Sequence, residues 1–511
     1  MTARKVVNID LNRVEGDLEF QIELEGNRIV DCRCIGTLYR GFEQILVGRA
    51  PRDAAVITPR ICGICGSAHL YCAVLALEQI WNVEVPANAT RIRNLCLMSE
   101  TLQSDLRQTF LFFTADFCHS KYADQDLYST ILNAFEPFAG RIHLETLDRS
   151  RQVVEIVAIL GGQWPHSSYM MPGGVTTPLT VRRILDCRSV LDKTIRWFEK
   201  SVLGGKLDKW LGLQSAAEFW EWLEQDSHQS GALGLFTRFS RAIGLHQIGF
   251  GTDHMLSYGS YCDPDHWGPN VEPRHLLKAG FYNGDSKQVS PFDQAAVSEH
   301  VRYSWFQPYT GGLHPFHGET KPDYDNSGDR YTWSKAPRYQ DRVVQTGPLA
   351  DLMIDGDPLI RSLHEAEGGN TWLRQFARLR RASQSLSLMT QTLDELARHV
   401  NEPTFRAFPK DKETDGEGFG LVTAARGALG HWVRLRDGQV DHYQIVTPTA
   451  WNASPKDSQG LHGHWESSLL GLSLDNPEDP VEVGHIVRSH DPCLVCTVHV
   501  LGSNRRVHYG V

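Results

Sequence analysis

Two cysteine pairs with the same spacing lie near opposite ends of the sequence. Cys62 and Cys65 enclose a Gly-Ile dipeptide, and Cys493 and Cys496 enclose Leu-Val. A spacing of three residues lets two thiolates reach one metal ion from a single turn of chain. A helical pattern begins directly after Cys65, and the positive end of a helix dipole lowers the pKa of a thiol. This favours the thiolate, which is the form that binds metals.

The separation of the two pairs narrows the kinds of site that they could form. Almost the whole chain lies between them, whereas the two pairs of a compact structural zinc site lie tens of residues apart. Thioredoxin-like redox chemistry needs a CxxC motif within a βαβ pattern, and neither pair has one. Two unrelated structural pairs, or four inert buried thiols, remain open from the spacing alone.

The elements that must position these cysteines change along the chain. Alternating polar and apolar side chains predict strands over 5–10, 17–25 and 28–35, with a turn at Gly26-Asn27. Helical spacing follows over 67–81, 87–117, 145–160, 181–202 and 371–399. Residues 251–349 are rich in Pro, Gly, Trp and Tyr and are expected to be irregular, and short alternating runs such as 432–446 come later. We predict a predominantly helical α+β fold with a core of long bundled helices and β-rich N- and C-terminal parts.

Composition places the chain among ordinary globular proteins. Hydrophobic residues make up 41% and charged residues 22% of the 511 residues, and the formal net charge is −10. The negative charge disfavours nucleic acid and acidic membrane surfaces as partners. No window is apolar enough for a transmembrane segment, and residues 1–15 lack the apolar core of a signal peptide. Eleven scattered cysteines fit reduced thiols better than a disulfide framework.

The residues that flank the cysteine pairs carry a family resemblance. Residues 59–69 read PRICGICGSAH, and residues 491–499 read DPCLVCTVH. Both are similar to the N- and C-terminal signatures of NiFe hydrogenase large subunits. Further matches follow in order at 13–16, 40–43, 172–175, 318–322, 425–432 and 447–455. The resemblance covers nearly the full length, and the two cysteine signatures together are its most specific part.

The resemblance implies a binuclear metal centre and a reaction. In this family four thiolates bind nickel, and the second cysteine of each pair also bridges to an iron that carries carbon monoxide and cyanide, Fe(CN)2CO. Carried over, Cys62 and Cys493 are terminal nickel ligands, whereas Cys65 and Cys496 bridge. Soft thiolates suit nickel and low-spin iron. The implied reaction is heterolytic cleavage of H2, as uptake oxidation to protons and electrons.

The resemblance also implies a proton route and an arginine beside the centre. The sulfur of Cys493 would accept the proton first and pass it to Glu15. A partly buried carboxyl near a thiolate is expected to have a raised pKa. Arg426 matches the family arginine above the open metal position, and Asp491 is expected to pair with it. Taken singly, such charged residues more often form ordinary salt bridges.

Two polar residues are implied as hydrogen-bond donors to ligands of the centre. His69 would donate to a bridging thiolate, with Cys65 as the expected acceptor, and Thr449 would donate to a cyanide nitrogen. Without the resemblance, each is more often a satisfied polar residue of the core.

Family large subunits also hold a magnesium ion near the C-terminus. Glu43 and His499 match its side-chain ligands, and the carbonyl of Ile445 matches a backbone ligand. A carboxylate, a carbonyl and several waters suit a hard cation. The resemblance therefore implies nickel, Fe(CN)2CO and magnesium as cofactors.

The last residues are interpreted as a maturation extension. Family precursors are cut after the histidine that corresponds to His499, once nickel is in place. The segment 500–511 follows that histidine here, and the alternative is a permanent C-terminal arm. We predict a single catalytic domain over 1–499 and an extension over 500–511. Hydrogen-sensing relatives generally lack such an extension, so its presence favours an enzyme that turns over.

Some residues depart from the pattern of membrane-bound members. Residues 100–110 read ETLQSDLRQTF, without the paired histidines of those members. The stretch resembles the cytosolic, cyanobacterial-type uptake group, group 2. Ala425 stands where many members have proline, and Ser104 stands where some have a carboxylate. An acidic partner for Arg426 from that helix is therefore in doubt.

The resemblance implies several partners. An Fe–S cluster small subunit would form a heterodimer with this chain, within a higher oligomer, and a maturation chaperone and a C-terminal endopeptidase would act on the precursor. We expect a cytoplasmic location, or peripheral association with the inner face of the cell membrane through partners. The alternatives are a subunit of an H2-sensing regulatory hydrogenase and a metal-free scaffold like the related subunit of complex I. The scaffold relative has lost the four cysteines that are present here.

Overall fold

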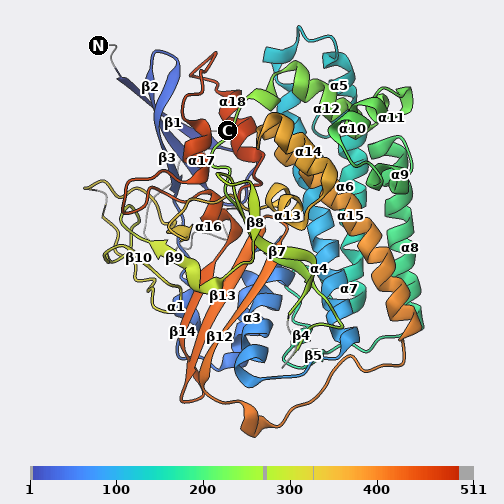
Figure 1. Cartoon of the computed structure of the whole chain (residues 1–511), viewed down its shortest axis with the longest axis vertical. Helices are drawn as coiled ribbons and strands as arrows, with labels where there is room; N and C mark the ends of the chain where they lie inside the picture. The colour runs from blue at the N-terminus through green and yellow to red at the C-terminus, as the bar shows by residue number, and fades with distance from the viewer. Residues whose placement is uncertain (1–3, 269–272, 326, 494–511) are drawn as a thin grey trace.

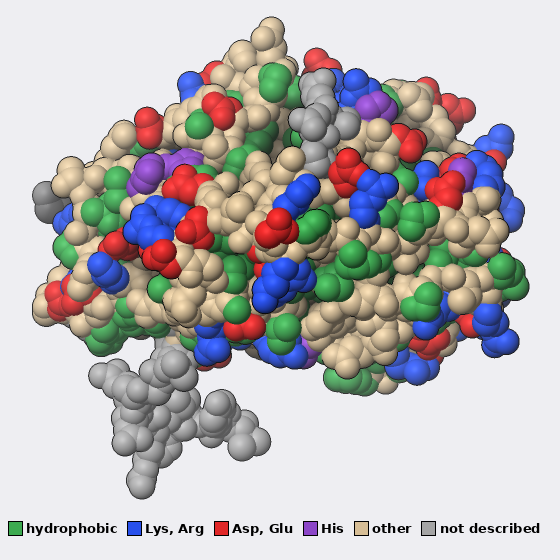
Figure 2. All heavy atoms as spheres, turned by 90° about the horizontal axis from the view of Figure 1, so that it is seen from below, with side chains coloured by type: hydrophobic (Ala, Val, Ile, Leu, Met, Phe, Trp, Pro, Cys, Tyr) green, Lys and Arg blue, Asp and Glu red, His purple; other side chains and the backbone are tan. Residues whose placement is uncertain are grey.

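The computed structural model describes residues 4–268, 273–325 and 327–493. Long helices lie side by side on one side of the molecule, and antiparallel strands lie on the other (Figure 1). None of the helices within these ranges is long and apolar enough to span a lipid bilayer. One face of the molecule carries acidic and basic side chains interspersed with one another (Figure 2). The predicted α+β architecture is confirmed.

The helical core forms around two long helices, α4 (Ala87–Arg107) and α15 (Thr371–Arg398), which pack against each other. Three further helices pack on this pair, namely α6 (Arg141–Val153), α7 (Glu155–Gly161) and α8 (Val181–Trp197). The regular turns of α4 end at Arg107 and continue as a π-helical turn, Gln108–Phe113. Leucine and phenylalanine side chains at helical spacing fill the space between these helices, which removes a large apolar area from water.

Further short helices pack around the helical core and the sheets. They are α1 (Phe42–Leu46), α2 (Ala54–Ile57), α5 (Tyr128–Phe135), α9 (Leu207–Leu211), α10 (Ala216–Leu223), α11 (Asp226–Ser230), α12 (Ala232–Ala242), α13 (Pro348–Asp355), α14 (Pro358–Glu367) and α16 (Pro448–Asn452).

An N-terminal sheet packs on helices from the other end of the chain. Its strands are β1 (Arg4–Leu11), β2 (Leu18–Glu25) and β3 (Arg28–Gly36), antiparallel in that order. Alternate residues of β2 are buried, as the sequence pattern predicts. They pack against α17 (His464–Leu469) and α18 (Val481–Arg488). This packing holds the N-terminal strands beside the segment that leads to the second cysteine pair.

A C-terminal sheet lies against the helix that follows the first cysteine pair. Its strands are β12 (Gly416–Ala424), β13 (Gly427–Arg436) and β14 (Gln439–Val446), and α3 (Gly66–Trp81) packs on it. Close approach depends on Gly420, because a Cβ atom there would lie 1.9 Å from the carbonyl oxygen of Cys72 in α3. The sheet and α3 are therefore packed closely together, directly after the first cysteine pair.

The segment 251–349 differs from its prediction. It holds strands as well as loops: β6 (Met255–Cys262), β7 (His275–Asn283), β8 (Gln288–Ser290), β9 (Val297–His300), β10 (Gly312–Leu313) and β11 (Ala336–Tyr339). A two-stranded sheet elsewhere joins β4 (Met170–Met171) and β5 (Gly174–Val175). Every residue of β6 is buried, so the strand has no polar face and no alternation to detect.

Candidate metal centre

The first cysteine pair lies in a tight turn at the start of α3. The helix begins at Gly66, with Cys65 as its N-cap residue, where the sequence predicts it. A Cβ atom at Gly66 would lie 2.9 Å from the carbonyl oxygen of Pro59, so only glycine lets the chain fold back so closely. The backbone N–H groups of Ile64 and Cys65 both donate to the sulfur of Cys62 at 3.4 Å. Such donors favour the thiolate over the thiol.

Cys493, the first cysteine of the second pair, lies next to the first pair. The sulfur atoms of Cys62 and Cys493 lie 3.7 Å apart. Both side chains are buried, with exposed fractions of 1% and 0%. The backbone N–H of Cys493 donates to the hydroxyl of Thr449 at 3.3 Å, and that of Glu15 donates to the carbonyl of Pro492 at the same distance. Hydrogen bonds thus connect the segment at Cys493 to α16 and to the N-terminal part of the chain.

The donor set fits a soft metal ion. Two thiolates at about 2.3 Å from one tetrahedral metal lie about 3.8 Å apart, close to the separation of the two sulfur atoms. Cys65 is buried beside them, with an exposed fraction of 4%. Within the described ranges no group of three His, Cys, Asp or Glu side chains is placed to hold an ion by itself. Cys496, the remaining predicted ligand, lies outside the described residues.

A buried ion pair lies beside the cysteines. The Nε atom of Arg426, at the turn between β12 and β13, is 3.1 Å from Oδ1 of Asp491. Burial alone would lower the pKa of Arg426, but Asp491 and the thiolates of Cys493 and Cys62 hold it well above the ordinary value. Its Nη1 atom is buried and has no hydrogen-bond partner among the described residues. Arg426 is therefore a permanent cation with an uncommitted donor next to the sulfur atoms.

The carboxylate of Asp491 has further partners that the sequence did not indicate. Its Oδ2 atom accepts from the hydroxyl of Ser104 at 3.3 Å and from Nη1 of Arg378 at 3.2 Å. Arg378, in α15, also bonds to Asp105 of α4 at 3.0 Å. Ser104 thus contacts Asp491, and its neighbour Asp105 is the carboxylate that α4 contributes to this network. No sequence signal marked the burial of Arg378, because its helical neighbours three and four positions away are mostly polar.

Glu15 lies at the edge of the same cluster. Burial and the nearby thiolate of Cys62 raise the pKa of this carboxyl, while the cations Arg426 and Arg107 oppose the rise. The residue is half-buried, and its backbone forms a parallel bridge with Cys493. Glu15 is thus a half-buried residue whose backbone lies next to the buried Cys493.

His69 is completely buried, one helical turn after Cys65. Burial lowers the pKa of His69 to about 4, so the ring is neutral at ordinary pH. Its Nδ1 atom lies 3.0 Å from Nε2 of His431, a contact that sequence reasoning missed. Its Nε2 atom has no hydrogen-bond partner within the described residues. Thr449, on the first turn of α16, accepts from Cys493 as described above.

The predicted magnesium ligands Glu43 and Ile445 line one small cavity of about 30 Å³. Gln444 donates to Oε1 of Glu43 at 3.1 Å. Two charged residues not expected from the sequence, Glu299 and Lys335, line the same cavity with Nζ and Oε2 3.6 Å apart. Burial raises the pKa of Glu43 to about 7, and the nearby Lys335 opposes the rise. His499 lies outside the described residues.

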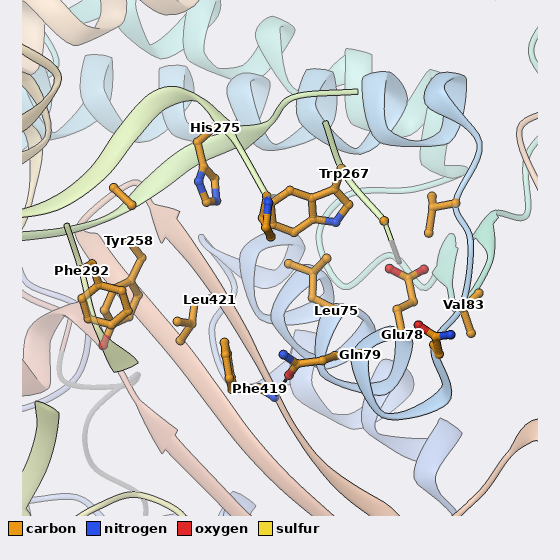
Figure 3. Close-up of a pocket in the computed structure, with 15 residues that line it drawn as sticks. Leu75, Glu78, Gln79, Val83, Tyr258, Trp267, His275, Phe292, Phe419 and Leu421 are labelled. Atoms are coloured by element: carbon orange, nitrogen blue, oxygen red, sulfur yellow. Dashed lines mark hydrogen bonds between the residues drawn. The ribbon is translucent and has the colours of Figure 1, made fainter. Parts of the chain in front are cut away.

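A larger apolar cavity of about 340 Å³ lies apart from these clusters (Figure 3). Leu75 of α3, Phe419 of β12 and Trp267 form parts of its wall. None of the predicted site residues lines it. The size of a cavity is thus a poor guide to the chemistry of this protein.

Two buried thiols whose sulfur atoms lie 3.7 Å apart, with a third buried cysteine beside them, fit the class of cysteine-liganded metalloproteins. The pattern of the family described as "Nickel-dependent hydrogenase" matches residues 40–126 and 235–499. The chain belongs to this family, and it is therefore a nickel-dependent hydrogenase subunit.

Named relatives agree with this assignment. The chain is 31% identical to the periplasmic NiFeSe hydrogenase large subunit of Desulfomicrobium baculatum, over 97% of this chain and 95% of that one. It is 26% identical to the uptake hydrogenase large subunit of Rhodobacter capsulatus, over 98% and 96% of the two chains. The solved Ni-Fe-Se hydrogenase from D. vulgaris Hildenborough matches with a TM-score of 0.81 and 28% identity, over 97% of this chain and 100% of that one. The similarity is thus to large subunits.

Proposed function

We propose that this chain is the catalytic large subunit of an uptake NiFe hydrogenase, which cleaves H2 heterolytically and passes the electrons to an Fe–S small subunit. The observation that carries the proposal is the approach of the Cys62 and Cys493 sulfur atoms to 3.7 Å, beside the buried cation Arg426. A shared metal ion accounts for the arrangement.

The cysteines would hold the metals as the family pattern implies. Cys62 and Cys493 would bind nickel terminally, and Cys65 and Cys496 would bridge to an iron that carries carbon monoxide and cyanide. When bound, this centre polarises the H–H bond and accepts its electrons. Arg426 is placed to stabilise negative charge at the centre, because it stays protonated and keeps a donor uncommitted. Thr449 would serve as a donor to the cyanide ligand.

Protons would leave through the chain's own residues. The sulfur of Cys493 is the proposed first acceptor, and the Glu15 carboxyl is the second. The backbone bridge between these residues keeps them adjacent. A carboxyl with a raised pKa exchanges protons with a thiol more readily than an ordinary glutamate does, because the two proton affinities are closer.

A magnesium ion would occupy the small cavity next to Glu43. The Glu43 carboxylate, the Ile445 carbonyl and the His499 ring are its proposed ligands. Glu299 and Lys335 line the same cavity and would bind the waters that complete the shell of a hard cation.

The assembly and its maturation follow from the same proposal. We assign 1–499 as the catalytic domain and 500–511 as an extension removed by an endopeptidase after a chaperone-assisted metal insertion. The stretch 100–110 supports membership of the cytosolic uptake group and a cytoplasmic location, although the Desulfomicrobium baculatum relative is periplasmic. Cell fractionation tests the location, and recovery of the mature chain from the periplasm would contradict it.

The central experiment is metal analysis and infrared spectroscopy of the chain purified with its small subunit. We expect nickel, iron, and absorption bands of iron-bound carbon monoxide and cyanide. Cys493→Ser should lose nickel and the bands. Cys72→Ser, which alters a buried cysteine of α3 outside the proposed ligand set, should retain both. Active, fully matured protein without these bands would overturn the proposal.

A further inference from the structure

A row of three buried side chains leads from the C-terminal sheet to His69. Nδ1 of His69 lies 3.0 Å from Nε2 of His431, and Nδ1 of His431 lies 2.8 Å from the hydroxyl oxygen of Tyr443. Both histidines have an exposed fraction of 0%, and Tyr443 has 2%. No role described above uses His431 or Tyr443.

The contact between these residues follows from the packing of α3 on the sheet. His431 in β13 pairs directly with Ile445 in β14, and Tyr443 precedes Ile445 by two positions. Residues two apart on a strand point to the same face, so His431 and Tyr443 are diagonal neighbours. Helix α3 packs against this sheet and carries His69 on its first turn. The row is thus fixed by regular secondary structure.

The hydrogen-bonding of the Tyr443 hydroxyl fixes which ring nitrogens of His431 and His69 carry a proton. Among the described residues, His431 is the one hydrogen-bond partner of the Tyr443 hydroxyl. If Nδ1 of His431 carried a proton, the hydroxyl proton would have no acceptor in a buried site, which is costly. Tyr443 therefore donates to Nδ1, and the proton of a neutral His431 ring lies on Nε2. That proton points at Nδ1 of His69, so the proton of His69 lies on Nε2.

The protonation states agree with this order. Burial lowers the pKa of His69 to about 4, and burial together with His69 lowers the pKa of His431 well below its ordinary value. Burial raises the pKa of Tyr443. Each ring thus carries one proton, and the hydroxyl keeps its own.

The Nε2–H of His69 is the free end of the row. It is buried, and no hydrogen-bond partner for it lies within the described part of the chain. The backbone N–H of His69 donates to the carbonyl of Cys65 at 3.2 Å, so His69 lies one helical turn from the cysteine pair. A thiolate is the acceptor that a buried N–H donor at this place needs.

We propose that Tyr443, His431 and His69 form a one-directional hydrogen-bond chain that presents the Nε2–H of His69 to a thiolate of the metal centre. His431 and Tyr443 are positioning residues, because they fix the tautomer of His69 without touching the metals. The inference rests on the proposed function, since the accepting thiolate belongs to the proposed NiFe centre.

The electronic consequence can be measured without activity. A hydrogen bond to a thiolate withdraws electron density from the sulfur, and therefore from the iron that a bridging sulfur contacts. Loss of the fixed tautomer should increase electron donation to iron and move the C–O stretching band to lower wavenumber by a few cm⁻¹. Tyr443→Phe removes the hydroxyl that starts the chain and is the first variant to examine in the mature heterodimer.

A matched control is available elsewhere in the molecule. The hydroxyl of Tyr122 is 3.0 Å from Nε2 of the buried His485, so Tyr122→Phe removes the same contact away from the thiols. We expect the band to move in Tyr443→Phe and to stay in place in Tyr122→Phe. An unmoved band in Tyr443→Phe at full metal content, or an equal shift in Tyr122→Phe, would overturn the inference.

A second pair of variants tests the middle of the chain. His431→Gln keeps a side-chain N–H donor towards His69 and should leave the band closer to its wild-type position than His431→Leu does. Nitrogen-15 NMR of histidine-labelled chain reads the His69 tautomer directly and does not depend on maturation. We expect one Nε2–H tautomer in the wild type and a mixture in His431→Leu, and a mixture in both proteins would contradict the inference. Missing infrared bands in the wild type would instead contradict the proposed function.

Discussion

Glu15 and Cys493 form an isolated parallel β-bridge, although one follows the first strand and the other follows the last helix. The bridge places the backbone of Glu15 beside Cys493, and burial together with Cys62 raises the pKa of the Glu15 carboxyl. A side chain that must receive a proton from a buried sulfur needs this adjacency. The pairing therefore bears directly on the proposed proton route.

Glu15→Gln should suppress H/D exchange while nickel and iron are retained. The amide keeps the size of the side chain but cannot accept and release a proton, so the route is interrupted after the thiol. Isotope exchange followed by mass spectrometry, together with metal analysis, measures both effects. Glu19→Gln is the matched control, because burial also raises the pKa of Glu19. Unchanged exchange in Glu15→Gln would remove this residue from the mechanism.

Arg378→Met should destabilise the protein by about 3–5 kcal/mol, because it leaves the buried carboxylates of Asp105 and Asp491 without one of their cations. Thermal unfolding monitored by circular dichroism measures the change. Arg182→Met removes an exposed i,i+4 partner of Asp186 and should leave the midpoint unchanged. If the two variants unfold at the same temperature, the buried network is not a source of stability.

The stability of the chain should fall as the pH drops from about 6.5 towards 4. Burial lowers the pKa of His485 to about 4, so the unfolded chain binds a proton in this window that the folded chain excludes. The contribution of this one group is complete above pH 6.5, and up to about 3 kcal/mol is lost at low pH. His485→Gln, which cannot titrate, should show a shallower decline of the unfolding midpoint. A parallel decline would contradict the assignment.

Glu43→Gln should lower the magnesium content of the mature enzyme. A neutral amide is a weaker ligand for a hard cation than a carboxylate is. Elemental analysis after dialysis against a weak chelator measures the loss, and nickel content serves as the internal reference. Glu413→Gln, at a partly exposed pair with Arg52, is the control that should retain magnesium. Equal magnesium content in both variants would exclude Glu43 as a ligand.

The sequence was a good guide where the helical periodicity was regular or where the spacing of cysteines was unusual. The helix starting at Gly66 and the long helix Thr371–Arg398 could be predicted from periodicity, and Cys62 and Cys493 from their spacing. Their meeting could not be predicted from spacing alone, because a pattern of residues carries no distance across a fold. The family resemblance supplied that link.

The residues that were missed lie inside regular elements. Arg378 and His431 have the spacing of their helix and strand, and nothing in the pattern separates a buried polar side chain from an exposed one. Strand β6 was missed for a related reason, since a strand buried on both faces has no polar alternation. Tertiary packing decides whether these residues are buried, and a local sequence pattern does not contain that information.

The contact between Cys62 and Cys493 joins residues 431 positions apart. During synthesis the first cysteine pair and its helix leave the ribosome long before the second pair exists. Closing so long a loop is entropically costly and comes late in folding. The polypeptide must therefore spend most of its synthesis with half of the proposed ligand set, and the proposed centre can be completed only when the last segment arrives.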